Sequence, residues 1–475
     1  MGCNKNGPEE EVAELHRFLS LDDKLDTQIF TFLLANPFDH NFEKVQSREF
    51  AYANNRWRLS IVKAEHNLHF YLQLLEATDG LVCSLDYAFS VLNRGDYARN
   101  ETFSESGCQF TKRASSHGRR SMISRDEILH DGYLDENHQL LVELTVKDAT
   151  TTFECEIDMR QSSDVRFPRH QSSYLSLAGF DWNVSVYPNG DWADHEGRVM
   201  VNLNRLTQFN HFCRVRYRIT IGDDSDTKCY TTDTLDDTFD FGGDGHGFQL
   251  YDDLERYMQD DRLKIVVEFL QLSVIRETKI YVFEDEAEKN QVYFVDLEKQ
   301  TWCIESDVTK KNLRFRLHYI DQYRLPNNYA RYLRWDVVVV GEAGQRKRAL
   351  EGPFSEYFAR RSDETACEMV TELPVKELAD PDKRYFSEGG PLRLTVHVEF
   401  LISHLLYKAN YDKQDDVSRR QIYQLKKQLL PEMASSASPS GGSGPSGHRA
   451  VENSHDSADD SGRGSKVWNS SVTSD

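Results

Sequence analysis

The sequence predicts a mainly all-β chain of tandem antiparallel β-sandwiches, with short flanking helices and a disordered C-terminal tail. Three observations support this class. A pattern of a tryptophan, two alternating strands and a closing alternating strand occurs three times, starting at Trp57, Trp182 and Trp302. Apolar and polar residues alternate within each copy, as in sheets with one buried face. The length of 475 residues suits about three domains of ordinary size.

Residues 1–45 are expected to form a helical N-terminal extension. The acidic run 9–11 follows Pro8, which suits a first helical turn. Apolar residues then recur at helical spacing, namely Val12, Leu15, Phe18 and Leu19. A second apolar stripe over residues 21–33 predicts another helix, and both helices are expected to pack on the first sandwich or on a partner.

The three copies define three expected domains, over residues 46–160, 161–290 and 291–408. Polar stretches at residues 161–173 and 284–290 are the expected joints. Each copy ends in an alternating strand, expected over residues 140–146, 263–269 and 392–400. The three tryptophans are expected to be core residues, because a tryptophan entering a sandwich can fill the space between its sheets.

Two segments follow the last copy. Residues 409–433 are expected to form an amphipathic helix, because Asp415 and Asp416 precede a helical apolar pattern and Pro431 ends it. Residues 434–475 are rich in Ser, Gly, Pro and Asp and are expected to be disordered, since they cannot bury enough apolar surface to offset ordering entropy.

Charge and cysteine usage limit the class of protein. A formal net charge of -21 would repel phosphate backbones, so nucleic-acid binding is not expected and basic or polar peptide partners are favoured. The eight cysteines form no CxxC pair, which favours a reducing compartment. Without a visible secretory signal or an apolar stretch of membrane-spanning length, we expect a cytoplasmic protein.

The first residues of the chain suggest an alternative location. Gly2 is available for myristate and Cys3 for palmitate, although Asn6 replaces the Ser or Thr preferred at that place. Two acyl chains would hold the protein firmly on a membrane, whereas one would hold it marginally. Membrane association is therefore expected only if the N-terminus is acylated.

The first copy also resembles a known family. Residues 68–74 and 89–93, and later residues 118–126 and 132–134, are similar in order to the MATH domain, also called the meprin and TRAF homology domain. Within that family the first copy is most similar to the speckle-type POZ branch. The second copy keeps Phe180 and Trp182 at its start and a glycine-rich turn at residues 245–248, and the third keeps Trp302. The resemblance implies three tandem MATH-like sandwiches that bind short, extended segments of partner proteins beside an edge strand.

The same resemblance implies the binding residues. In the first copy these are Tyr71, Phe110, Ser116, His117 and Arg119, and in the second they are Asp244, His246 and Phe248. Position by position, Asn202 of the second copy and Arg316 of the third correspond to Tyr71. The first copy's turn lacks the acid and both aromatic residues of the family pattern, so a different peptide preference is expected.

Each position also has an ordinary structural interpretation. Tyr71 can be an exposed strand tyrosine and Phe248 a plug at the end of the sandwich. The two histidines are expected to be turn residues rather than metal ligands, because no second ligand stands at a useful spacing.

The chain shows no chemical signature of an enzyme. There is no CxxC or HExxH zinc motif, no phosphate-binding loop and no signature around a nucleophile, so we expect no catalytic residue, no metal and no cofactor. The main hypothesis is a non-enzymatic adaptor in ubiquitin-ligase or signalling assemblies. Two alternatives are a membrane-cortex structural scaffold and a divergent ubiquitin-pathway hydrolase.

Overall fold

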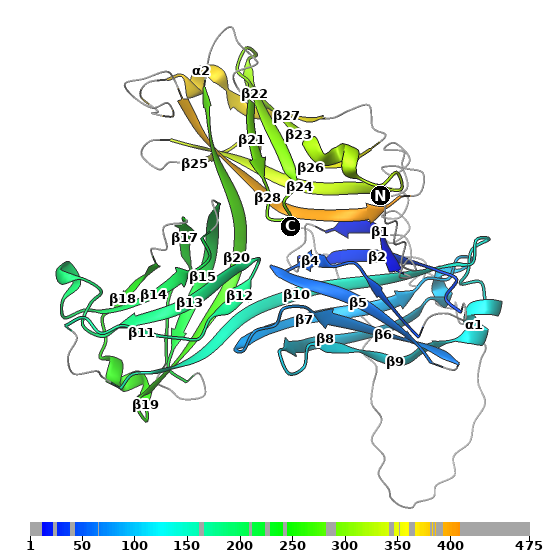
Figure 1. The fold of residues 1–475 in the computed structure, drawn as a ribbon, viewed down its shortest axis with the longest axis horizontal. Helices are drawn as coiled ribbons and strands as arrows, with labels where there is room; N and C mark the ends of the chain where they lie inside the picture. Colours follow the sequence, from blue (N-terminus) through cyan, green and yellow to red (C-terminus); the bar gives the residue numbers. More distant parts are fainter. Residues whose placement is uncertain are drawn as a thin grey trace, which may run out of the picture. The chain divides into compact units, whose positions relative to one another are not determined.

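A computed structural model provides the structure of the chain. It describes residues 12–21, 26–38, 43–64, 66–160, 166–208, 211–223, 229–240, 245–281, 291–341, 346–350, 352–360, 366–380, 382, 385 and 393–408. Strands dominate these residues, and the described helices are short (Figure 1). The predicted all-β class is confirmed.

The first unit is a sandwich of two antiparallel sheets. One sheet contains β3 (Lys44–Ser47), β4 (Phe50–Tyr52), β5 (Asn55–Lys63), β6 (Asn67–Leu74) and β9 (Ser116–Ser124). The other contains β2 (Gln28–Ala35), β7 (Leu81–Val91), β8 (Glu101–Thr111) and β10 (Gln139–Asp158). Strand β1 (Val12–Ser20) pairs with β2 and with β3, so it links the two sheets along one side. A 3-10 turn (Tyr97–Arg99) precedes β8, and helix α1 (Arg125–His130) follows β9.

The predicted N-terminal helices are wrong, because β1 and β2 form an antiparallel hairpin. The register of this hairpin shifts between Leu15 and Arg17, which marks a β-bulge. The extra residue lets Leu15 and Phe18 both be buried although they are three positions apart. The bulge therefore produced the spacing that indicates a helix. In β2, residues 28–34 are all buried, as in a strand covered on both faces.

The second and third units repeat this pairing pattern. In the second, one sheet contains β11 (His170–Gln171), β12 (Leu175–Leu177), β13 (Phe180–Tyr187), β14 (Val199–Arg205) and β18 (His246–Leu250). The other contains β15 (Phe212–Ile221), β16 (Tyr230–Thr231), β17 (Leu235–Phe239), β19 (Met258–Gln259) and β20 (Arg262–Tyr281). Two 3-10 turns (Ala193–His195 and Leu254–Tyr257) belong to this unit.

In the third unit, one sheet contains β21 (Gln291–Val295), β22 (Thr301–Asp307), β23 (Asn312–Tyr319) and β27 (Ala366–Pro374). The other contains β24 (Tyr329–Val340), β25 (Arg346–Arg348), β26 (Phe354–Ala359) and β28 (Arg393–Tyr407). A 3-10 turn (Ile320–Arg324) and helix α2 (Val375–Leu378) complete the unit.

Two long strands connect the units. The first part of β10 pairs with β2 and β7, and its last part, residues 151–158, pairs with β20. In the same way, β20 pairs with β15 and then, through residues 274–281, with β28. The domain limits expected at residues 160 and 290 therefore follow strands that already pair with the next unit.

The apolar side chains form three main clusters, each around one of the expected tryptophans. Trp57 is 1% exposed, and Trp182 and Trp302 are 0% exposed, so their assignment to the core is confirmed. The first cluster also contains Tyr332 and Leu406 of the third unit. The expected C-terminal helix and tail, and the acylation candidates Gly2 and Cys3, lie outside the described residues.

Candidate functional site

The face around Tyr71 is the first candidate surface. Tyr71 of β6 is half-buried and lies between Ser60 of β5 and Gly118 of β9. A Cβ atom on Gly118 would lie 2.0 Å from the Phe70 carbonyl oxygen and 2.7 Å from the Tyr71 Cα. Only glycine fits there, and it leaves no side chain between Tyr71 and the far edge of β9.

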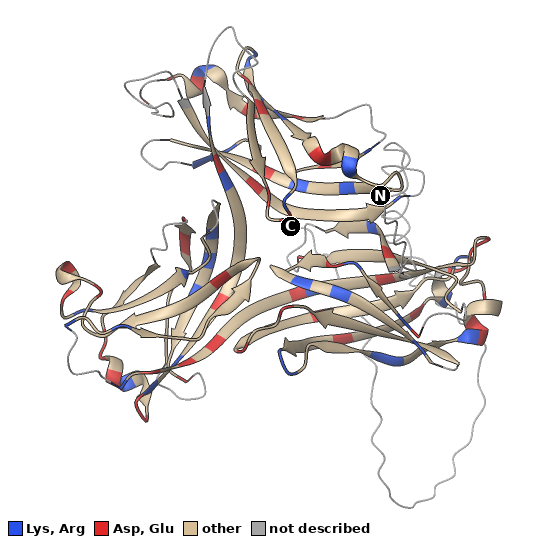
Figure 2. Ribbon diagram, in the orientation of Figure 1, with Lys and Arg blue, Asp and Glu red and all other residues tan. Residues whose placement is uncertain are grey.

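Strand β9 has an open edge. Among the strands that the structure describes, β9 forms a ladder with β6 only. Ser116, Arg119 and Arg120 on this strand are exposed, and the Arg119 guanidinium lies over the Phe103 ring at 5.3 Å. Basic residues are visible on β5 and β9 in Figure 2. The edge therefore offers backbone hydrogen-bonding groups next to positive charge.

Phe110 is not at the surface, which corrects the expected site. Its side chain is 0% exposed and meets Trp57 edge to face, with ring centroids 4.8 Å apart. Phe110 has the inward phase of β8, where it pairs with Cys83. His117 also turns inward and lies 4.7 Å from the Phe110 ring, so this histidine is more than a turn residue. Of the expected members of the first site, Ser116 and Arg119 are exposed and Tyr71 is half-buried.

The second unit has the same register but a different surface. Asn202 pairs with Gly247 and Ser185, as Tyr71 pairs with Gly118 and Ser60. Asn202 is only 8% exposed, and its neighbour Asn204 donates to Asn183 Oδ1 at 2.9 Å and to Ser185 Oγ at 2.8 Å. This face uses its polar groups internally.

The other expected residues of the second unit lie near that face. His246 packs its ring on Phe239 at 4.7 Å, and Phe248 stacks on Tyr230 at 5.8 Å, which supports the interpretation of Phe248 as a packing residue. Asp244 lies outside the described residues.

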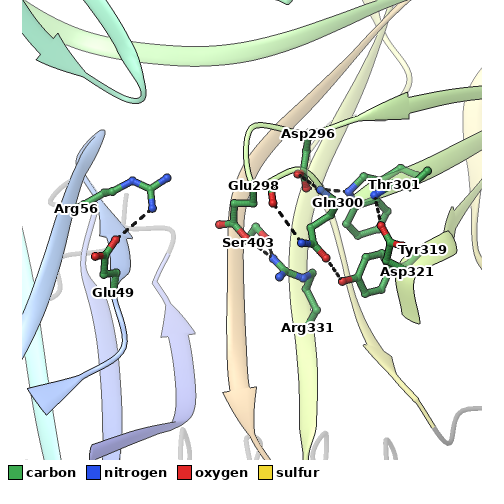
Figure 3. Close-up of polar contacts among 11 residues, drawn as sticks. Glu49, Arg56, Asp296, Glu298, Gln300, Thr301, Tyr319, Asp321, Arg331 and Ser403 are labelled. Atoms are coloured by element: carbon green, nitrogen blue, oxygen red, sulfur yellow. Dashed lines mark hydrogen bonds and ion pairs between the residues drawn. The ribbon is translucent and has the colours of Figure 1, made fainter. Parts of the chain in front are cut away.

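In the third unit, the position that corresponds to Tyr71 and Asn202 belongs to an ion-pair network. Arg316, which corresponds to Tyr71, lies 3.8 Å from Glu305 and 3.7 Å from Glu368. Deeper in the unit, the buried Arg331 donates to Glu298 at 2.7 Å and to Ser403 at 2.8 Å (Figure 3). Burial raises the pKa of Asp296, although this carboxyl accepts a hydrogen bond from the Trp302 indole. These contacts hold the segment before β22 in place and account for the buried charge.

A tyrosine–acid pair recurs at the end of the first two sandwiches. The Tyr87 hydroxyl donates to Glu105 at 2.6 Å, and the Tyr217 hydroxyl donates to Asp237 at 2.8 Å. Burial and the adjacent acid raise the pKa of both phenols, so both remain protonated donors. Sequence inspection missed these pairs because their members lie on different strands. The available signal was the equivalent place of the two tyrosines in the repeated pattern.

Comparison with known proteins finds a family that is similar to the first sandwich. Residues 37–147 match the family model of the MATH domain. MATH domains are protein-interaction domains without catalytic function, so this part of the chain is similar to a protein-binding domain. The matched segment contains Tyr71 and the whole of β9.

The remaining comparisons add little. No curated protein sequence matches the chain. A crystal structure of a protein from Parabacteroides distasonis aligns with 84% of this chain and 91% of its own, at 8% identity and a TM-score of 0.10, which carries no structural argument. Among the described residues, no helix has the length and apolarity needed to cross a membrane.

Proposed function

We propose that the chain is a non-enzymatic adaptor that binds an extended segment of a partner protein along β9, beside Tyr71. The main support is the open edge of β9 next to a glycine, within a segment that matches a protein-interaction family. An added strand would gain main-chain hydrogen bonds from the edge and side-chain selectivity from the surface around Tyr71.

The charge around this edge favours an acidic segment. Arg119 and Arg120 are exposed on β9, whereas Arg56 and Arg58 of β5 pair with Glu49 at 3.3 Å and 3.1 Å. Exposed arginines attract carboxylates or phosphates and make association sensitive to salt. The exposed arginines of β9 therefore favour an acidic partner segment, whereas the overall charge of -21 favours a basic or polar one.

The repeated register supports a wider proposal, that the second and third units are divergent MATH-like copies. Tyr71, Asn202 and Arg316 each occupy the same position relative to the unit's first tryptophan-bearing strand. The filled faces of the last two units support our proposal that the first unit binds the peptide. We further propose that the adaptor serves in ubiquitin-ligase or signalling assemblies, in the cytoplasm or, if its N-terminus is acylated, on a membrane. A membrane-cortex scaffold and a divergent ubiquitin-pathway hydrolase are the alternatives.

A displayed peptide library selected on the full-length protein tests this function. We expect acidic extended peptides to be enriched, and Tyr71→Ala or Arg119→Glu to weaken their binding at least tenfold. Tyr174→Ala is the matched control, because Tyr174 is 60% exposed and lies on the second unit. Binding that survives both Tyr71→Ala and Arg119→Glu, or that is lost equally in Tyr174→Ala, would reject the proposed surface.

A further inference from the structure

Three potential metal ligands meet at the side of the first sandwich opposite β1. Glu105 and Cys108 lie on β8, and His117 lies on the neighbouring β9. One ligand atom from each residue, a carboxylate oxygen, the Sγ atom and an imidazole nitrogen, lies within 4.8 Å of the other two. The spacing argument against a metal ligand therefore fails here, because the group is assembled across two strands.

A β-bulge explains why two residues of β8 face the same way. Leu85 pairs with Cys108 and Tyr87 with Glu105, so Asp86 alone stands opposite Ser106 and Gly107. Gly107 has φ +61°, and its N–H donates to Asp86 Oδ1 at 2.7 Å. In a regular strand, residues three apart point to opposite faces, and the extra residue removes this difference.

One buried polar atom of the group has no hydrogen-bond partner. His117 Nε2 is buried and has no hydrogen-bond partner. Cys108 is 5% exposed, and burial together with the Glu105 carboxylate raises the pKa of its thiol to about 12. Buried polar atoms without partners are rare in folded proteins. A cation between these side chains would accept the imidazole lone pair and neutralise the thiolate and the carboxylate.

We propose that Glu105, Cys108 and His117 bind a zinc ion, with one coordination position left open. Sulfur, imidazole nitrogen and carboxylate oxygen are zinc ligands, and three protein ligands are the usual number where the fourth position takes water or another molecule. Ligands on one tetrahedral ion lie about 3.5 Å apart for such bond lengths, so the side chains close inward by about an ångström on binding.

A neighbouring hydrogen bond prepares the carboxylate. The Tyr87 hydroxyl donates to Glu105 Oε2 at 2.6 Å, which fixes the group and leaves its other oxygen for the metal. Such outer contacts orient metal ligands and strengthen binding. Water or a side chain of a bound partner would complete the coordination.

The second unit provides a natural negative control. Its Tyr217, Asp237 and His246 correspond to Tyr87, Cys108 and His117, but Leu235 stands opposite Tyr217 where Glu105 stands opposite Tyr87. His246 Nδ1 lies 3.8 Å from Asp237 Oδ1. With two ligands among the described residues, this place is not expected to hold zinc.

The test uses the full-length protein, stripped with a chelator and titrated with Co²⁺ and then Zn²⁺. We expect one Co²⁺ per chain with a thiolate charge-transfer band, displaced by Zn²⁺. Cys108→Ser should abolish the band, and His117→Gln or Glu105→Gln should weaken Zn²⁺ binding at least tenfold. Binding should tighten as pH rises, because the Cys108 proton is released to solvent.

Control variants separate this site from adventitious binding. Cys229 is the exposed cysteine of the described residues, so Cys229→Ser must retain the band, as must His246→Gln. Circular dichroism shows whether each variant is folded. If Cys108→Ser is folded and keeps the Co²⁺ band, or if the stripped parent protein binds neither ion, the zinc site is rejected. If Cys108→Ser retains peptide binding, a contribution of zinc to peptide binding is rejected. The zinc site itself is not rejected by that result.

Discussion

The first and second sandwiches keep the same aromatic core but differ in the polar groups at its end. In both, a tryptophan contacts a phenylalanine edge to face, at 4.8 Å for Trp57–Phe110 and 5.1 Å for Trp182–Phe239. A histidine then packs on that phenylalanine at 4.7 Å in each unit. The aromatic contacts that pack the core are therefore the same in both units, whereas the residues at the proposed zinc-ligand positions differ.

The two outer faces differ in the same sense. Tyr71 is half-exposed beside an open strand edge, whereas Asn202 is nearly buried next to Asn204, whose amide donates to Asn183 Oδ1 and Ser185 Oγ. Buried hydrogen bonds fix side chains and leave fewer groups for a partner. Binding capacity is thus expected in the first unit and structural support in the second, and the following experiments examine this difference.

Tryptophan removal should have the largest effect, and it should be similar in both units. Trp57→Ala and Trp182→Ala each remove a fully buried ring, which costs about 3–5 kcal/mol of unfolding free energy. Urea denaturation followed by circular dichroism measures the change. Trp192→Ala is the control, because Trp192 is 59% exposed and should change stability by less than about 0.5 kcal/mol. A small effect at Trp182 alone would show that the two cores are not equivalent.

Acid should destabilise the apolar cluster of the first unit, because the buried His404 packs against it. This residue of β28 lies 4.6 Å from the Phe18 ring and 5.5 Å from the Phe30 ring. Burial, aided by Arg331, lowers its pKa to about 3. The folded state thus keeps His404 neutral while the unfolded state protonates near pH 6.5, so stability is lost as pH falls from about 6.5 towards 3, by up to about 1.4 kcal/mol per pH unit.

Denaturation curves at several pH values measure this slope. His404→Leu should reduce the slope below pH 6.5 by about one proton. The exposed Trp192 provides the control, since Trp192→Ala removes no titratable group and should keep the parent slope. An unchanged slope in His404→Leu would show that the contact between β28 and the first core is not where the proton is taken up.

Alanine at Gly118 of the first unit, or at the corresponding Gly247 of the second, should reduce stability by an intermediate amount. Its Cβ would lie 2.0 Å from the Phe70 carbonyl oxygen at Gly118 and 1.9 Å from the Val201 carbonyl oxygen at Gly247. Backbone must shift in each case, at a cost of about 1–3 kcal/mol. Thermal denaturation should show similar losses for Gly118→Ala and Gly247→Ala. Gly352→Ala, which meets nothing within 4 Å, should leave the midpoint close to the parent value.

The sequence predicted the structural features that depend on a regular alternation of apolar and polar residues. Alternation predicted the strands. The repeated pattern relates Tyr71 to Asn202, and in the ladders Tyr71 pairs with Gly118 as Asn202 pairs with Gly247. Two failures have one cause, because β-bulges interrupt the period of two. The bulge after Leu15 made a strand resemble a helix, and the bulge at Gly107 placed Glu105 and Cys108 on one face. Neither the bulges nor the pairing across β8 and β9 can be read from spacing along the chain.

Removal of the two tyrosine hydroxyls should have the smallest effect on stability and distinguishes the units most sharply. Tyr87→Phe and Tyr217→Phe each delete one hydrogen bond to an acid. In the presence of a metal chelator, each variant should therefore lose about 1 kcal/mol of unfolding free energy. With zinc present, only Tyr87→Phe should lose more, because Glu105 would be held less firmly and metal affinity would fall about tenfold or more. Denaturation with and without Zn²⁺ measures the difference. Equal losses in both conditions would mean that the two acids have the same structural role, and that the bulge of β8 does not create a metal site.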